Sequence, residues 1–411
     1  MQKRFLLWDN PLSAIITITI ILMIVGAINV YSASFVAASA MFGNGSFYLV
    51  RYIAWGVVGL IALRITGWNF NYHSILKYKN QIYLGALLLL ICVDAFGATT
   101  KGAQRWLVIG SFSFQPSEFV KLVIVLVGAD FLGTYLQQGK RISLFSLDSG
   151  KAMAAAILLA GLVLIQPDMG TAAIILSLMI VLYIVAGTKI SEITSLLAIA
   201  VVGVVMLIAI APYRFNRIKV WLDPWKDPQG AGYQMVQSLT SIGSGGWFGS
   251  GIGMGTGKFF FLPEAHTDFA FAIFCQELGF VSAVILIVVF LILAKAIYKI
   301  GINTTDEKGY LLVTGINFFI VGQAVSNMAM VCGLLPVIGV PLPFISYGGT
   351  ALVATLIAIG IVCSVYRDEI KKEKKPEPKR PPRYEEEKVP AYRRNFKSSS
   401  DLLQFKPRGR Q

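Results

Sequence analysis

The chain consists of long apolar stretches separated by shorter polar segments. A helix needs about 20 consecutive, mostly apolar residues to cross a bilayer. The stretches that fit this pattern are 12–34, 47–65, 81–98, 118–136, 152–167, 170–187, 194–211, 268–298, 310–334 and 347–366. The pattern predicts an all-α polytopic integral membrane protein with about ten transmembrane helices.

Basic residues between these stretches predict the orientation of the helices, because lysine and arginine are enriched in cytoplasmic connections. They occur near the N-terminus, in the connections 77–79, 140–151 and 299–308, at Lys189, and in the C-terminal tail. Both termini are therefore expected in the cytoplasm. The large segment between the seventh and eighth helices, 212–267, is expected outside.

The overall composition fits this picture. Hydrophobic residues make up 55% of the chain and charged residues only 14%, whereas soluble domains carry about 25% charged residues. A mean hydropathy of +0.67 excludes an ordinary soluble enzyme, a disordered protein and a nucleic-acid-binding domain. Four scattered cysteines and two histidines provide neither a disulfide framework nor a Cys/His zinc site.

The end of the chain differs from the rest. Residues 367–411 hold 15 Lys and Arg against 8 Asp and Glu, so this short part carries half of the net charge of +14. Such a segment is typical of a disordered cytoplasmic tail beside anionic lipid or a partner protein. We therefore expect a ten-helix membrane core over 1–366, with the active-site region in loop 212–267, and a basic tail over 367–411.

Ionisable residues near the apolar stretches need a partner or a function, because a charge in a membrane helix is costly. Glu118 and Lys121 lie three positions apart, on one face of the fourth helix. They are interpreted equally well as a self-neutralising ion pair or as a charged site open to the outside. Asp168, in the turn between the fifth and sixth helices, is expected to cap a helix.

The long loop contains further candidates for binding an anion. Arg214 and Arg217 present forked donors that suit pyrophosphate or carboxylate oxygens, although anchoring in lipid headgroups is the alternative. The glycines of 243–257 precede Lys258 but match neither GxxxxGK[ST] nor GxGxxG. Nucleotide binding is therefore rejected, and these glycines are expected to permit tight turns near a substrate or the membrane.

Asp268 is the strongest candidate for catalysis. It lies at the predicted outer end of the eighth helix, where the helix dipole would lower its pKa and desolvation would raise it. A carboxylate balanced in this way suits a general base, and the alternative is a simple N-cap. Glu264 could share its face. The segment 333–350 contains Ser346 and is interrupted by proline and glycine. It is interpreted either as a simple rigid turn or, at least as well, as a packed wall beside the Asp268 loop.

Five motifs resemble the SEDS family (shape, elongation, division, sporulation) of bacterial peptidoglycan polymerases over residues 10–366. They are Gly102-Ala103-Gln104-Arg105-Trp106, Gln115-Pro116-Ser117-Glu118, Gln166-Pro167-Asp168-Met169-Gly170-Thr171, residues 262–269 and residues 341–349. Asp223-Pro224-Trp225, Gly232-Tyr233-Gln234 and residues 263–268 are more similar to the division branch, FtsW and its sporulation relative, than to the elongation branch, RodA.

The resemblance implies a glycosyltransferase that polymerises lipid II at the outer face of the bacterial cytoplasmic membrane, during septal wall synthesis. Asp268 would be its general base. The residues expected to contact the substrate are Arg105, Trp106, Glu118, Lys121, Asp168, Arg214, Arg217, Lys258, Glu264 and Ser346. A divalent cation (Mg or Mn) is a further candidate. The implied partner is a class B penicillin-binding protein, and the basic tail is a candidate for binding other division proteins. The alternatives are a lipid II flippase and a non-catalytic division scaffold.

Overall fold

The computed structural model describes residues 10–100, 103–109, 112–210, 212–259 and 261–373. The chain divides into two units, residues 1–369 and 370–411. Of the second unit, the structure describes only Ile370–Glu373, the last residues of the C-terminal helix. The predicted disordered tail therefore lies almost entirely outside the described residues, and the division at residue 366 stays a prediction.

The first unit is built mainly from helices, as the apolar pattern predicts. The helical elements are α1 (Pro11–Phe42), α2 (Phe47–Arg64), η1 (Ile65–Asn69), α3 (Tyr72–Lys77), α4 (Lys79–Phe96), α5 (Pro116–Gln137), α6 (Lys151–Ile165), α7 (Met169–Val185), α8 (Ile190–Ile210), α9 (Pro212–Leu222), η2 (Pro224–Lys226), α10 (Tyr233–Ser244), α11 (Ala270–Ile302), α12 (Glu307–Asn317), η3 (Phe318–Gly322), α13 (Gln323–Val331) and α14 (Gly349–Glu373).

Seven helical segments in the described part of the chain are long and apolar enough to cross a membrane. They are α1, α2 with η1, α4, α5, α11, α12 with η3 and α13, and α14. The other three predicted stretches form the shorter apolar helices α6 and α7 and the apolar part of α8. The polytopic membrane fold is thus confirmed, whereas the count of ten spans and the orientation stay predictions.

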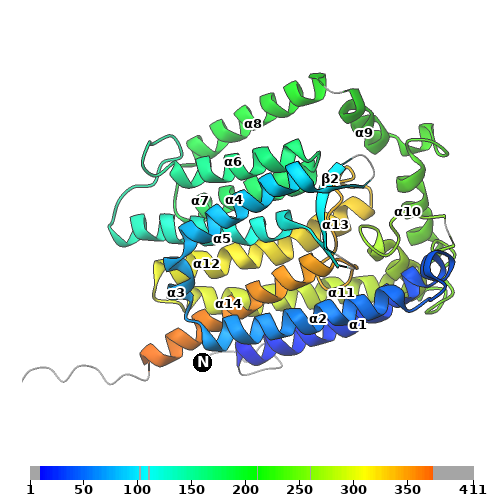
Figure 1. Ribbon diagram of the computed structural model, residues 1–411, viewed down its shortest axis with the longest axis horizontal. Helices are drawn as coiled ribbons and strands as arrows, with labels where there is room; N and C mark the ends of the chain where they lie inside the picture. The colour runs from blue at the N-terminus through cyan, green and yellow to red at the C-terminus, as the bar shows by residue number, and fades with distance from the viewer. Residues whose placement is uncertain (1–9, 101–102, 110–111, 211, 260, 374–411) are drawn as a thin grey trace, which may run out of the picture. The chain divides into compact units, whose positions relative to one another are not determined.

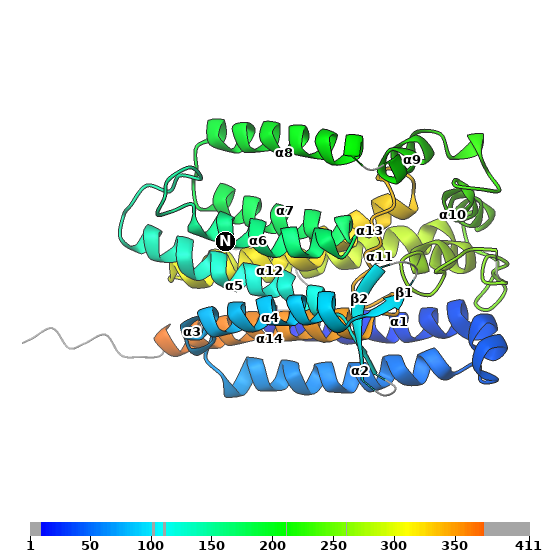
Figure 2. The same ribbon diagram turned by 45° about the horizontal axis from the view of Figure 1, so that its top comes forward.

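The long helices lie side by side, and β2, α9 and α10 gather at one end of them (Figures 1 and 2). Within the most apolar window of each span, 83% of the residues are buried in α14 and 67% in α5, but only 22% in α2 and 17% in α4. Helices α5 and α14 are therefore central, and the apolar outer surfaces of α2 and α4 are suited to contact lipid.

A small sheet interrupts the helical pattern. Strands β1 (Ala98–Thr100), β2 (Ala103–Ile109) and β3 (Phe112–Phe114) are antiparallel in the order β1-β2-β3. Ala98 pairs with Trp106, and Leu107 pairs with Phe114. These strands were not predicted from the sequence, although the alternation of apolar and small polar residues over 99–117 is typical of a strand with two different faces.

The segment 212–267 is folded, which explains its length. It contains α9, η2 and α10, followed by glycine-rich turns over 245–257. Figure 1 shows these green elements at the same end of the molecule as β2 and α13. The sequence features that indicated chemistry therefore gather at this end.

Candidate active site

Asp268 lies in a turn immediately before α11. The helix begins at Ala270, with Phe269 as its N-cap and without a hydrogen bond from a capping side chain. The turn is closed by the main-chain oxygen of Glu264, which accepts from Thr267 N at 3.1 Å and from Phe269 N at 3.2 Å. Glu264 has a left-handed φ of 56°, and its carboxylate accepts from Thr267 Oγ1 at 2.7 Å. Asp268 is therefore not the N-cap of this helix, which was the alternative interpretation.

Gly339 lies next to the Asp268 carboxylate. A Cβ atom placed on Gly339 would lie 3.6 Å from Asp268 Oδ2, and the φ of this glycine is +67°. Gly339 belongs to the irregular segment 337–348, which we call the wall. The wall lies beside the turn that carries Asp268, as the sequence predicts.

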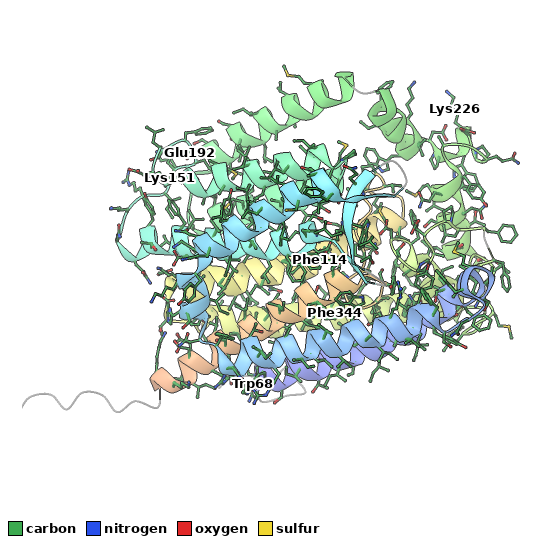
Figure 3. All side chains as sticks on the ribbon, in the orientation of Figure 1. Trp68, Phe114, Lys151, Glu192, Lys226 and Phe344 are labelled. Carbon is green, nitrogen blue, oxygen red and sulfur yellow. The ribbon has the colours of Figure 1, made fainter. Side chains whose placement is uncertain are left out.

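The wall is fastened to several helices although it has no regular structure. Tyr347 N donates to His266 O at 2.8 Å, which joins the wall to the Asp268 turn. Tyr52 OH, on α2, donates to Phe344 O at 2.5 Å. Phe344, labelled in Figure 3, is buried in the interior of the protein. A Cβ on Gly170 would lie 1.9 Å from Ile338 O, so the wall also touches the start of α7.

Ser346 has a role within the wall itself. It is buried, its Oγ accepts from Leu342 N at 2.9 Å, and its own N–H donates to Leu342 O at 3.0 Å. These two bonds close a turn inside the wall. The predicted contact of Ser346 with the substrate stays a prediction.

Aromatic rings line the wall next to the Asp268 turn. The ring of Tyr48 lies 4.3 Å from that of His266 and 5.0 Å from that of Tyr347, measured between centroids. Burial raises the pKa of Tyr347, and the Arg51 guanidinium opposes this shift through its charge and a hydrogen bond. Tyr347 therefore keeps its proton at neutral pH.

Glu118 and Lys121 form a buried ion pair at the start of α5. Lys121 Nζ lies 2.8 Å from Glu118 Oε2, and the side chains are 0% and 2% exposed. Lys121 Nζ also donates to Gln323 Oε1 at 2.7 Å, and Gln323 Nε2 donates to Pro341 O of the wall at 2.9 Å. The ion pair of the first interpretation is thus present and buried, and the contacts of Glu118 and Lys121 with a substrate stay predictions.

The side chains of Asp168 and Arg105 both stabilise the loop between α6 and α7. Asp168 is the N-cap of α7 and accepts from Thr171 N at 3.1 Å and from Thr171 Oγ1 at 3.0 Å. The predicted capping role is therefore confirmed. Arg105, on β2 next to Trp106, donates to Gln166 O at 3.0 Å and to the carbonyl oxygen of Pro167. Both side chains hold the loop between α6 and α7, and the contacts of Arg105, Trp106 and Asp168 with a substrate stay predictions.

Lys258 is neutralised by a residue that the sequence analysis did not connect with it. Its Nζ lies 2.8 Å from Glu277 Oε1, and both side chains are less than 5% exposed. Ser32 Oγ, on α1, donates to the same carboxylate at 2.7 Å, and Lys258 also donates to Gly253 O at 2.6 Å. Lys258 thus binds the glycine-rich turns to α11 and α1, so its charge is already paired.

The glycines before Lys258 allow the chain to pack against an interruption in α11. Gly279 has a φ of +78° and a ψ of −178°, which breaks the helix. A Cβ on Gly249 would lie 2.1 Å from Glu277 O, and one on Gly279 would lie 2.3 Å from Gly249 N. Main-chain hydrogen bonds join the two segments: Phe280 N to Gly246 O (2.9 Å), Val281 N to Trp247 O (3.1 Å), Ser250 N to Gln276 O (3.0 Å) and Gly251 N to Glu277 O (3.0 Å). The predicted tight turns are present, and they satisfy backbone groups that the broken helix leaves free.

Two predicted groups of ligands cannot be placed. Arg214 and Arg217 lie on α9, but their side chains are outside the described part of the structure. Within the described ranges, no group of three or more His, Cys, Asp or Glu side chains could hold a metal ion. The divalent cation therefore stays a prediction.

A model of the FTSW_RODA_SPOVE family, described as "Cell cycle protein", matches residues 12–371. The chain belongs to this family. The predicted resemblance is thus confirmed.

Relatives with similar sequences carry the names of the division and sporulation members. A Geobacter sp. (strain M18) protein named "Probable peptidoglycan glycosyltransferase FtsW" is 37% identical over 355 residues, which cover 85% of this chain and 95% of that protein. "Stage V sporulation protein E" of Bacillus subtilis (strain 168) is 36% identical over 362 residues, covering 87% and 97%.

A solved structure has a similar fold. It contains a chain of a peptidoglycan synthase complex and concerns the coordination of polymerization and crosslinking by that complex. The TM-score is 0.73 at 26% identity, with 89% of this chain and 99% of that chain covered. The described helices therefore have the arrangement of a family member that works in a complex.

Proposed function

We propose that this protein is a membrane-embedded peptidoglycan glycosyltransferase that polymerises lipid II during cell division. The proposal is supported by the family, by relatives named as peptidoglycan glycosyltransferases, and by the shared fold. The single structural observation that carries it is the Asp268 carboxylate, held in the turn before α11 and faced by Gly339 of the wall.

In the proposed reaction, Asp268 is the general base. Its carboxylate takes the proton from the 4-hydroxyl of the acceptor GlcNAc. The hydroxyl oxygen attacks C1 of the donor MurNAc and forms the new glycosidic bond with inversion. The bond between C1 and the pyrophosphate oxygen breaks, and its electron pair leaves with undecaprenyl pyrophosphate. The proton remains on Asp268 until it is released to solvent.

The leaving group gains negative charge and needs cationic donors close to it. Among the five predicted cations, Lys121 and Lys258 are each paired with a carboxylate, and Arg105 donates to two carbonyl groups. We therefore propose that Arg214 and Arg217 of α9 supply this stabilisation, because forked guanidinium donors match pyrophosphate oxygens.

We further propose a class B penicillin-binding protein as the partner and the division septum as the site of action. The partner is supported by the similar chain in a peptidoglycan synthase complex that coordinates polymerization with crosslinking. A transpeptidase bound to this chain would crosslink the strands as they form.

The test is glycan synthesis from purified lipid II by the protein in complex with its partner. Wild type, Asp268→Asn and the control Asp148→Asn, which changes an exposed carboxylate in the connection before α6, would be compared at equal amounts of intact complex. We expect the polymerisation rate to fall about 10²–10⁴-fold in Asp268→Asn, the contribution of a general base, and to stay at the wild-type level in Asp148→Asn. Equal polymer from Asp268→Asn would exclude Asp268 as the base. Absence of polymer from an intact wild-type complex would favour the flippase or scaffold instead.

A further inference from the structure

One buried amide connects the two sides of the candidate site. Asn327 lies on α13 and is 0% exposed. Its Nδ2 donates to the main-chain oxygen of Asp268 at 2.8 Å and to that of Val340 at 2.7 Å. Asp268 carries the carboxylate, and Val340 follows Gly339, the residue that faces this carboxylate. The two hydrogens of a single amide thus fix the turn before α11 against the wall.

The orientation of this amide is determined by its donors. Because Nδ2 is shared between two carbonyl groups, Oδ1 must point elsewhere, and in the described part of the structure it is buried without a hydrogen-bond partner. A buried acceptor without a partner costs about 1–3 kcal/mol in folded proteins. The fold thus leaves Asn327 Oδ1 unpaired while Nδ2 keeps its hydrogen bonds to Asp268 O and Val340 O.

A second amide supports the wall from the same helical segment. Gln323, four residues before Asn327, donates to Pro341 O and accepts from Lys121. Residues four apart lie on one face of a helix. The carbonyl groups of Val340 and Pro341 are therefore held by adjacent side chains, and the buried pair of Lys121 and Glu118 anchors this arrangement.

We infer that Asn327 is a positioning residue of the transferase reaction. It holds the Asp268 main chain at a fixed distance from the wall and so sets the direction from which the carboxylate meets the acceptor hydroxyl. The inference rests on the proposed role of Asp268 as the base. The positioning role predicts that kcat depends on the hydrogen bonds donated by the Asn327 amide and not on the volume of the side chain.

The experiment compares three variants of the full chain in complex with its partner. Asn327→Asp keeps the size of the side chain but replaces both donor hydrogens with an acceptor that faces two carbonyl oxygens. Asn327→Ala removes the side chain. Asn317→Ala is the matched control. Like Asn327, Asn317 donates through Nδ2 to a main-chain carbonyl group, Ala294 O of α11 at 3.1 Å, and its Oδ1 is buried without a partner in the described residues.

The readouts are kcat and KM for lipid II polymerisation, with complex formation and thermal unfolding measured on the same samples. A misplacement of about 1 Å can cost on the order of 100-fold. We therefore expect both Asn327 variants to lose about 10- to 100-fold in kcat with less than a threefold change in KM, whereas Asn317→Ala keeps the wild-type kcat.

Wild-type kcat in Asn327→Asp, or equal losses in the Asn327 and Asn317 variants, would overturn the inference. Asp268→Asn, measured in parallel, separates the two proposals. If that variant retained activity, the proposed base would be wrong. If it were inactive while Asn327→Asp turned over normally, only the positioning role would be wrong.

Discussion

Lys258 and Glu277 form an ion pair of 2.8 Å that is nearly inaccessible to solvent. Nineteen positions separate them in the chain, and Ser32 of α1 donates to the same carboxylate. The pair joins the glycine-rich turns to α11 just before the break at Gly279. It holds together the segment that leads into residues 262–268.

Removing one partner of this ion pair should destabilise the protein more than removing both. Lys258→Met leaves the Glu277 carboxylate buried without a cation, and Glu277→Gln leaves the ammonium without an anion. Breaking a buried pair in this way costs about 3–5 kcal/mol. We expect the double variant to unfold at a higher temperature than either single variant, measured by thermal unfolding in detergent. If the decreases in stability of the two single variants simply added in the double variant, the two charges would act independently.

Gly339→Ala should reduce activity through its position next to Asp268. The left-handed φ of +67° makes any side chain unfavourable by about 1–2 kcal/mol, and the new methyl group would lie 3.6 Å from Asp268 Oδ2. Gly333→Ala is the matched control, with a φ of +76° and Leu239 Cδ2 at 3.6 Å as the nearest atom. We expect similar decreases in unfolding temperature but a lower kcat only for Gly339→Ala. Equal kcat values would contradict a role for open space beside the carboxylate.

Asp168→Ala should lower stability by the amount that a helix N-cap contributes, about 0.5–2 kcal/mol. Asp168→Ser keeps an oxygen able to accept from Thr171 N and should recover most of this loss. Thermal unfolding checks the stability, and KM for lipid II separates capping from substrate binding. If Asp168 also contacted the substrate, Asp168→Ser would have near-normal stability and a raised KM.

Gly279→Ala should separate the glycine-rich turns from α11. The backbone conformation at Gly279 costs other residues about 1–3 kcal/mol, and a Cβ there would overlap Gly249 N at 2.3 Å. Limited proteolysis should then cleave within 245–257 faster than in wild type. Gly243→Ala is the control, since a Cβ at that position of α10 meets no atom within 4 Å and should stabilise the helix by up to about 1 kcal/mol. An unchanged cleavage rate in Gly279→Ala would show that the main-chain hydrogen bonds between 246–251 and 276–281 do not hold the turns in place.

Local patterns in the sequence predicted the elements of this fold better than the contacts between them. The apolar stretches predicted the long helices, and the three-residue spacing of Glu118 and Lys121 predicted an ion pair, because both signals depend on neighbouring positions. The strands over 98–114 were missed because they are only three to seven residues long.

Contacts between distant segments could not be predicted from one sequence. Asp130 has no basic residue within four positions of it in the sequence, yet it lies between Lys308, at 2.7 Å, and Lys79. Asn327 could not be identified from the sequence, because a lone amide in an apolar helix has no local signature. Its function depends on two carbonyl groups contributed by the Asp268 turn and by the wall.

The wall also limits how the length of the chain can change. Its carbonyl groups at 340, 341 and 344 each meet a donor on a different side chain, from Asn327, Gln323 and Tyr52. One inserted or deleted residue would move every following carbonyl by one position and separate it from its donor. One residue inserted into the segment 337–348 is therefore expected to impair the protein more than one inserted into the connection 138–150, even where the side chains of 337–348 can be exchanged.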